Sequence, residues 1–299
     1  MKSSPSRDTQ LPHIPVMVNE VLQYLNINPN GIYVDVTVGA GGHSKHILNQ
    51  LSPTGTLVGF DRDNEALDLA KNTLSASPSR INLACASYHT FPSFLHSKGM
   101  SSVNGFLLDL GLSSMQLDDA SRGFAFSKSG PLDMRFDQQS DLDATSLINH
   151  SSEEEIANII YEYGEERLSR RIAKSITNKR PISTVDELYE AIRTATPPQH
   201  RNKTLARVFQ AFRIAVNQEL EKLDSFLSSF MDSLLIGGRI VIMSYHSLED
   251  RMVKHAFKSL KQAGELKVLT KKPVMASDEE IQINPRSRSA KLRAAERII

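Results

Sequence analysis

One stretch near the start of the chain limits the fold more than any other. Between residues 32 and 51 an apolar run, a cluster of glycines and an amphipathic helix follow one another. The β-branched run at 32–36 is typical of a strand buried in a parallel sheet. Gly39, Gly41 and Gly42 allow the backbone to approach a ligand closely, and the start of the next helix offers unpaired N–H groups. This order predicts a nucleotide-type site at the end of the first strand.

A second strand, at residues 56–61, narrows the kind of ligand. It ends in Asp61, 22 residues after Gly39. A carboxylate about 20 residues beyond a glycine turn can accept hydrogen bonds from both hydroxyls of a ribose. The dinucleotide motif G-x-G-x-x-G would require glycine at position 44, where the chain has Ser44. The spacing favours S-adenosylmethionine (SAM) as the cofactor, with NAD as the alternative.

Composition excludes several classes of protein. The formal net charge is +1 over 299 residues, so any surface for nucleic acid must be a local patch. Cys85 is the only cysteine, which excludes an intramolecular disulfide and a cysteine metal cluster. Residues 1–12 lack the apolar core of a signal peptide and are expected to fray. The chain also has no apolar run of about 18 residues, the length that spans a bilayer. We expect a cytoplasmic enzyme without a metal or a membrane contact.

Alternation of strands and helices predicts the fold class. It continues to a fourth strand at residues 105–110, which includes Asp109, and it indicates a doubly wound parallel α/β sheet. The chain then enters a loop at 111–137 and a helical region, so residues 113–200 are predicted to be an all-helical insertion. Residues 1–112 and 201–299 are predicted to form the SAM-binding domain.

The last third of the chain completes the predicted sheet. One long helix is expected from Leu205 to Leu234, and a fifth strand at 239–244. After one more helix, two strands follow in succession, at 266–270 and 291–299, separated by a polar loop. This order predicts a class I SAM-dependent methyltransferase sheet of seven strands, in which the last strand is antiparallel. A dehydrogenase would more often continue with α/β units.

Ten short motifs follow one another along the whole chain. They are His13-Ile14-Pro15-Val16, Asp35–Ser44, Asp61-Arg62-Asp63, Leu107–Asp118, Arg122-Gly123-Phe124, Gly130–Arg135, Tyr163-Gly164-Glu165, Phe209-Gln210-Ala211, Ser244–Arg251 and Asn284–Ser289. With these motifs the chain resembles the bacterial RsmH (MraW) family. Members of that family use SAM to methylate the exocyclic N4 of a cytidine in the decoding region of small-subunit (16S) ribosomal RNA.

The resemblance implies a set of cofactor contacts and a partner. The SAM contacts that it implies are Gly41, Gly42, His43, Asp61, Tyr88, Asp109 and Gln116. The implied partner is small-subunit ribosomal RNA or the assembled small ribosomal subunit. The sequence leaves open whether the enzyme is a monomer or a homodimer.

The chemistry of cytosine N4 points to two candidate catalytic residues. Its lone pair is delocalised into the ring, so the amine needs a hydrogen-bond acceptor and precise positioning. Asp109 ends the fourth strand, where an open α/β sheet places its ligand crevice. His246 follows the fifth strand and is the second candidate for accepting the proton, with a structural role at a helix start as the alternative.

RNA contacts are expected from aromatic and basic residues. A target base must leave its stack and can then stack on an aromatic ring. Phe124 and Tyr245 are candidates for that ring, although Phe124 could instead belong to a small core under the loop. Arg122, Arg135, Arg286 and Arg288 are candidates for phosphate contacts, with a solvated basic face as the alternative.

Two other functions remain compatible with the sequence. One is a SAM-binding ribosome-assembly factor without catalytic activity. The other is an amino-methyltransferase that acts on DNA or protein. Titration with SAM and analysis of the methylated product would distinguish them from an rRNA methyltransferase.

Overall fold

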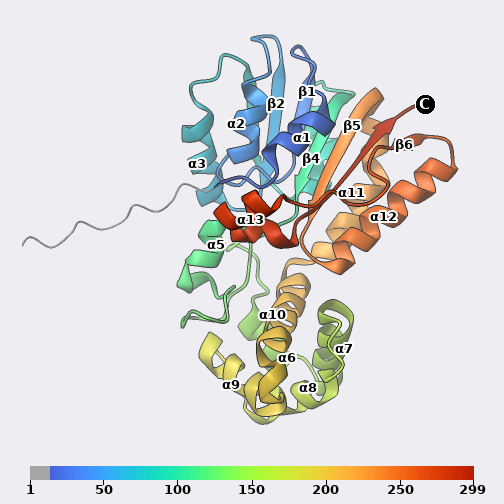
Figure 1. Cartoon of the computed structure of the whole chain (residues 1–299). Coiled ribbons are helices and arrows are strands. Elements are labelled where there is room, and N and C mark those ends of the chain that lie inside the picture. Colours follow the sequence, from blue (N-terminus) through green and yellow to red (C-terminus); the bar gives the residue numbers. More distant parts are fainter. Residues whose placement is uncertain (1–13) are drawn as a thin grey trace, which may run out of the picture.

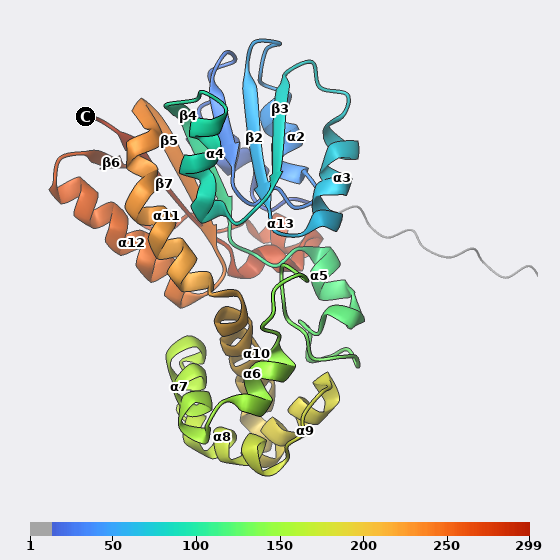
Figure 2. The same ribbon diagram turned by 180° about the vertical axis from the view of Figure 1, so that it is seen from behind.

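A computed structural model describes residues 14–299 and contains one seven-stranded sheet (Figures 1 and 2). The expected tail at 1–12 and His13 of the first motif lie outside the described residues. The strands are β1 Ile32–Asp35, β2 Thr56–Asp61, β3 Arg80–Cys85, β4 Val103–Asp109, β5 Leu234–Ser244, β6 Leu266–Val268 and β7 Lys291–Arg297. Their order is β3-β2-β1-β4-β5-β7-β6. Neighbours from β3 to β5 are parallel, and β7 is antiparallel to both β5 and β6, which confirms the predicted class I methyltransferase sheet.

Helices cover both faces of this sheet (Figures 1 and 2). On one face lie α1 Val18–Leu25, α2 Gly42–Leu48 and α3 Asn64–Leu74, and on the other lie α4 Phe91–Ser97, α11 Glu219–Ser233 and α12 Ser247–Gln262. Strand β4 shows how the sequence supports two cores. Phe106 and Leu108 belong to the core beneath α4 and α11, whereas Leu107 belongs to the core beneath α1 and α2. This is the period of two expected of a strand buried on both faces.

A separate helical body lies beyond the carboxyl ends of the strands (Figure 1). It consists of α6 Ala144–His150, α7 Glu153–Gly164, α8 Ser169–Asn178, α9 Val185–Ala195 and α10 Arg201–Asn217. Its buried residues form one cluster that runs from Phe124 to Val216. The core of this body therefore includes α10, which lies beyond residue 200, the predicted end of the insertion.

The single helix predicted from Leu205 to Leu234 is wrong. Helix α10 ends at Asn217, Gln218 has a left-handed conformation with φ 51°, and α11 begins at Glu219. The apolar period continues across this break, but the two helices serve different cores. Phe212 packs in the helical body, whereas Phe226 packs against the sheet. A periodic pattern does not reveal such a change of direction, because it records burial and not the partner.

Both predicted loops contain short helices. The loop at 111–137 holds α5 Ser114–Asp118 and a 3₁₀ turn at Ala120–Arg122, and the loop before β7 holds α13 Asp278–Ile283 and a 3₁₀ turn at Pro285–Ser289. Serine caps start both α-helices, because Ser113 and Ser277 each accept a backbone N–H two or three positions into the helix. Further 3₁₀ turns lie at Tyr88–Thr90 and Pro198–His200. None of the helices between residues 14 and 299 has the length and apolar character needed to span a membrane.

Candidate active site

A cavity of about 1100 Å³, counted with its part open to solvent, lies at the carboxyl ends of β1, β2 and β4. This is the crevice in which open α/β sheets bind their ligands. The glycine turn at 36–43 forms one side of it, and residues 109–113 form another. Six of the seven predicted cofactor residues line it, namely Gly42, His43, Asp61, Tyr88, Asp109 and Gln116.

The glycine turn follows β1 as the sequence predicted. Gly39 and Gly41 have φ values of 53° and 88°, which glycine adopts without strain. A side chain at Gly39 would meet no atom within 4 Å, so this position faces open space. A side chain at Gly41 would instead meet Leu74 and Ala70 of α3. Gly41 is therefore needed for packing against α3, whereas Gly39 and Gly42 face the cavity.

The Asp61 carboxylate accepts hydrogen bonds from the protein at about half of its acceptor positions. Its Oδ2 accepts the Gly39 N–H at 2.8 Å, and its Oδ1 accepts the Asp63 N–H at 2.9 Å. Burial raises the pKa of Asp61. A carboxylate offers about four lone-pair directions, so about one on each oxygen remains for a ligand. Two neighbouring hydroxyls, as in a ribose, match this pair of acceptors.

Asp109 carries the least satisfied carboxylate of the cavity. Its backbone N–H donates to Thr37 Oγ1 at 2.7 Å, which anchors the residue between β4 and β1. Its Oδ1 is buried and has no hydrogen-bond partner among residues 14–299. Its Oδ2 lies 3.8 Å from His43 Nδ1. A buried acceptor without a donor is costly, so this oxygen predicts a hydrogen-bond donor here, either a bound ligand or the neighbouring Tyr245 hydroxyl.

His43 and Asp35 are neighbours of the Asp109 carboxylate. His43 Nε2 lies 2.7 Å from the Val16 carbonyl, which can only accept, so Nε2 is assigned the proton. The other ring nitrogen then faces Asp109. Asp35 is 1% exposed, and burial raises its pKa to about 6. Asp35 does not line the cavity, but its charge acts on Asp109, which does.

Tyr88 and Gln116 both form part of the cavity wall. The Tyr88 hydroxyl donates to the Glu219 carbonyl at 3.3 Å, and burial raises its pKa, so it stays protonated. Gln116 Nε2 donates to Asp63 Oδ2 at 3.3 Å, and its Oε1 accepts the Ser113 N–H at 3.2 Å. The Gln116 amide is thus largely engaged within the protein, which leaves it a role in shaping the wall.

His246 lies behind the cavity as the cap of α12. Its Nδ1 accepts the Glu249 N–H at 3.4 Å, and its Nε2 lies 3.1 Å from Glu249 Oε1. His246 is not among the lining residues, whereas Glu249 is. Glu219, His246 and Glu249 are close enough to hold a metal ion, but Arg213 binds both Glu219 oxygens at 2.9 and 3.0 Å. This position favours the helix-cap role of His246 over the catalytic one.

Two of the predicted RNA contacts are wrong because the residues are buried. Arg122 is 4% exposed, and its guanidinium donates to Asp63, to the Arg135 carbonyl and to the Phe136 carbonyl. Phe124 is 6% exposed and stacks on Phe136 at 5.5 Å between ring centroids, within the helical core. Neither side chain can reach a phosphate or a flipped base.

The other predicted RNA contacts have different degrees of access. Arg286 and Arg288 are exposed, and Arg286 pairs with Asp118 at 3.0 Å. Arg135 is 22% exposed at its side chain and pairs with Asp133 at 2.7 Å. Burial and the neighbouring Asp109 raise the pKa of Tyr245 well above its ordinary value, so its hydroxyl stays protonated.

Several lining residues were not among the predicted cofactor contacts. Arg62, Ser113, Phe136 and Glu219 line the cavity. The motif Asp61-Arg62-Asp63 is a signal for Arg62, since it directly follows the predicted ribose ligand. No comparable local signal marks Glu219, which follows the unpredicted break between α10 and α11.

Comparison with known proteins agrees with this geometry. A family model described as the MraW methylase family matches residues 10–298. A Nostoc protein named ribosomal RNA small subunit methyltransferase H is 48% identical over 290 residues, which cover 95% of this chain and 92% of that protein. Proteins of the same name from Trichodesmium erythraeum and Thermotoga neapolitana are 47% and 48% identical over 290 residues. These cover 96% and 95% of this chain and 99% and 95% of the relatives.

Proposed function

The chain belongs to the MraW methylase family, and on that premise we propose that it methylates the exocyclic N4 of a cytidine in the decoding region of small-subunit ribosomal RNA. SAM supplies an electrophilic methyl group on a sulfonium sulfur. The observation that carries the proposal is the unpartnered Asp109 Oδ1, which lies at the carboxyl end of β4 in the same cavity as Asp61 and the glycine turn. Its position matches a site that receives an amine.

The residues of the cavity fit the cofactor. Asp61 has acceptor capacity left for the ribose hydroxyls, since each of its oxygens accepts one backbone N–H. Gly39 leaves open space beside the turn, which suits a ligand that approaches the backbone. Tyr88, Leu112 and Phe136 give the cavity apolar walls suited to a flat base.

Asp109 is the residue to which we assign the catalytic role. The Asp109 carboxylate would accept a hydrogen bond from the cytosine amine and hold the lone pair toward the methyl donor. Such positioning supplies up to ~7–11 kcal/mol of a reaction barrier. Methylation makes the amine strongly acidic, so the same carboxylate or a water molecule suffices to accept its proton. The Asp109 backbone N–H, which donates to Thr37 Oγ1 at 2.7 Å, holds the residue in place, and His43 Nδ1 lies beside the carboxylate, 3.8 Å from Oδ2.

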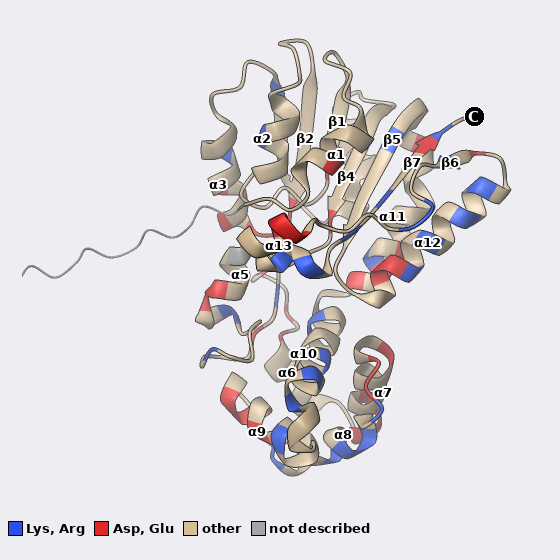
Figure 3. Ribbon diagram, in the orientation of Figure 1, with Lys and Arg blue, Asp and Glu red and all other residues tan. Residues whose placement is uncertain are grey.

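We place a contact with the RNA backbone on helix α12. Lys254, Lys258 and Lys261 are exposed, and their spacing places them on one face of the helix. The chain has no Asp or Glu between residues 251 and 264. Figure 3 shows several blue bands along α12 after the acidic residues of its first turn, and one of these, Glu249, lines the cavity. Arg286 and Arg288 would extend the same contact on the other side of β5.

We assign substrate recognition to the helical body and move its predicted end from residue 200 to Asn217. We also place the enzyme in the cytoplasm, where the small subunit is assembled.

Nucleoside mass spectrometry tests the proposal. Small-subunit ribosomal RNA from cells that lack this chain should lack N4-methylated cytidine, and the wild-type chain should restore it. Asp109→Asn should restore less than about a hundredth, the scale lost with one stabilising polar group. The same deletion cells test the alternative substrates. If their rRNA methylation is unchanged while methyl groups are lost from DNA or protein, rRNA is not the substrate. Full methylation by Asp109→Asn would remove the assigned catalytic residue.

A further inference from the structure

We propose that Asp63 and Arg122 are positioning residues, which hold one wall of the cofactor cavity against the carboxylate that binds the ribose. The inference rests on the proposed function, because it takes Asp61 as the ribose ligand. Segment 113–136 supplies that wall, through Ser113, Gln116 and Phe136. It belongs to the connection that leaves β4 for the helical body, so nothing in the sheet itself fixes its place.

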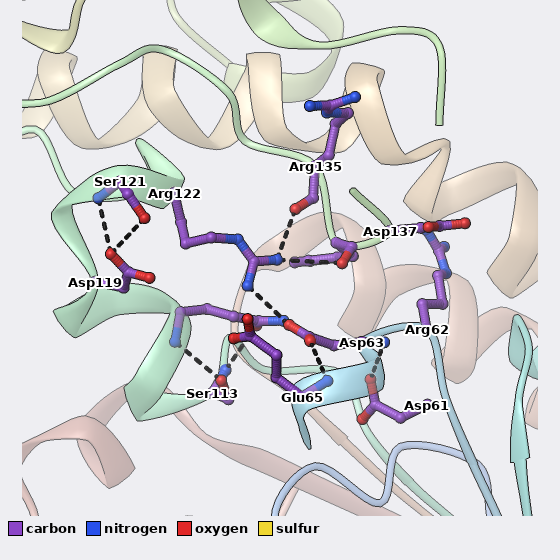
Figure 4. A network of polar contacts seen from close by, with 12 residues as sticks. Asp61, Arg62, Asp63, Glu65, Ser113, Asp119, Ser121, Arg122, Arg135 and Asp137 are labelled. Atoms are coloured by element: carbon purple, nitrogen blue, oxygen red, sulfur yellow. Dashed lines mark hydrogen bonds and ion pairs between the residues drawn. The ribbon is translucent and has the colours of Figure 1, made fainter. Parts of the chain in front are cut away.

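Asp63 is the hub of this arrangement (Figure 4). Its N–H donates to Asp61 Oδ1 at 2.9 Å, and its own Oδ1 caps α3 by accepting the Glu65 N–H at 3.1 Å. Its Oδ2 accepts from Gln116 Nε2 at 3.3 Å and from Arg122 Nη1 at 2.9 Å. One residue therefore touches the ribose carboxylate with its backbone and the cavity wall with its side chain.

Arg122 ties the far part of the wall to Asp63. Its Nη2 donates to the Arg135 carbonyl at 3.0 Å and to the Phe136 carbonyl at 3.2 Å (Figure 4). Its guanidinium lies over the Phe124 ring, 5.8 Å from the centroid. Arg122 and Asp63 are 4% and 10% exposed at their side chains, so their ion pair is shielded from water. If Arg122 lost Asp63, a charge would be left buried without compensation, and the wall would shift to solvate it.

Arg62 makes a second tie from the same turn. Its Nη1 and Nη2 donate to the Asn217 carbonyl at 3.1 and 3.2 Å, at the end of α10. Asn217 Oδ1 accepts the Phe136 N–H at 2.8 Å. Arg62 and Asp63, the two residues after Asp61, thus contact both segments that connect the sheet with the helical body, namely 113–136 and the end of α10. The position of Asp61 and the position of the wall are set together.

Cofactor affinity is the readout that separates positioning from plain stability. Asp63→Asn keeps the shape of the side chain but removes the charge that Arg122 faces. We expect it to weaken SAM binding, measured by calorimetry on the folded protein, by about tenfold, within the usual range of coupling between sites. Arg122→Lys keeps the charge but loses the fork to the two carbonyls, so its SAM affinity should fall by a smaller factor.

Glu296→Gln provides the matched control. Glu296 pairs with Arg239 at 2.8 Å between β7 and β5, and neither residue lines the cavity. This variant should lower the melting temperature but leave the SAM dissociation constant within about twofold, because no cavity wall depends on the pair. An equal loss of affinity in Glu296→Gln and Asp63→Asn would mean general destabilisation and would overturn the proposal.

A double-mutant cycle completes the test. The cycle compares Asp63→Asn, Arg122→Gln and the double variant. If the two residues act as one unit, the double variant should bind SAM no more weakly than the weaker-binding of the two single variants. Additive losses would overturn the proposal. Wild-type affinity in Asp63→Asn, with affinity lost in Asp61→Ala, would also overturn it while the proposed function stands. Absence of SAM binding by the wild-type chain would instead refute the proposed function.

Discussion

At the scale of single residues, three carboxylates of the cavity region differ in how far the protein satisfies them. Asp35 accepts from Ser44 Oγ at 2.7 Å and from the Thr37 N–H at 3.2 Å. Asp61 accepts one N–H on each oxygen, and Asp109 Oδ1 accepts none among the described residues. Acceptor capacity left over is where a ligand binds. From the number of hydrogen bonds that each carboxylate accepts, we assign a structural role to Asp35, cofactor binding to Asp61 and binding of the reacting amine to Asp109.

Asp61→Ala tests the cofactor assignment. The variant removes both acceptors offered to the ribose and also frees the Gly39 N–H, which Asp61 holds at 2.8 Å. We expect SAM to bind at least about tenfold more weakly, which corresponds to about 1.4 kcal/mol. Isothermal titration calorimetry measures this directly. Equal affinity in the variant and the wild type would remove Asp61 from the site.

Asp35→Asn tests the effect of burial on a charge. The folded-state pKa is about 6, raised from 3.8 by desolvation, so the folded state holds this proton more tightly than the unfolded chain. The stability that the group contributes is therefore complete below pH 3.8 and is lost as the pH rises through 6. The asparagine does not titrate, so its stability relative to wild type should rise between pH 4 and pH 7 by about 3 kcal/mol at most. Urea unfolding at several pH values measures the difference, and a constant difference would contradict the prediction.

At the scale of secondary structure, the break between α10 and α11 decides how the two bodies are joined. Gln218 is exposed and left-handed, with φ 51°. Its position turns the chain from the helical core toward the sheet. The Asn217 carbonyl just before it binds Arg62, and Lys222 Nζ donates to the same oxygen at 2.8 Å. Burial is the main reason that the pKa of Lys222 is lowered to about 8.

Gln218→Gly tests the strain at this break. A left-handed conformation costs an L-residue about 1 kcal/mol or more, and glycine does not bear this cost. The variant should gain up to about 1 kcal/mol of unfolding free energy, since the lost side chain is exposed. Ala206→Gly, at an exposed position in the interior of α10, should lose about 1 kcal/mol and serves as the control. Chemical denaturation measures both, and losses of equal size would show that Gln218 is not strained.

At the scale of the whole molecule, side-chain contacts hold the helical body to the sheet at two places. At one of them Arg122 and Asp63 form a buried pair at 2.9 Å. At the other Glu165, after α7, accepts from Ser247 and from Arg251 at the start of α12. Arg251 and Glu165 are 52% and 40% exposed, so this pair contributes at most about 1 kcal/mol. The buried pair therefore contributes more than the exposed pair to holding the helical body on the sheet.

The basic face of α12 predicts a salt-dependent contact with the ribosomal subunit. Lys254→Glu with Lys258→Glu should lower the slope of log affinity against log salt by roughly one to two, because each phosphate contact contributes about 0.7–0.9. Lys45→Glu with Lys71→Glu changes the same charge on α2 and α3, on the opposite face of the sheet, and should leave the slope unchanged (Figures 1 and 3). Binding of the small subunit at several salt concentrations measures both pairs. Equal slopes for the two pairs would exclude α12 from the RNA surface.

Local pattern was enough to predict the sheet, the glycine turn, the position of Asp61 at the cavity and the membership of the family. Each depends on residues that are close in sequence or on a period along one strand, and both are visible in the chain itself. The burial of Arg122 and Phe124 could not be predicted in this way, because their partners are distant in sequence and come close only in the folded chain. Asp63 lies 59 positions from Arg122, and whether an arginine meets a phosphate or a buried carboxylate depends on which of them the fold brings near. The unpartnered oxygen of Asp109 and the turn at Gln218 were decided in the same way, because burial and direction belong to the packed chain and not to its order.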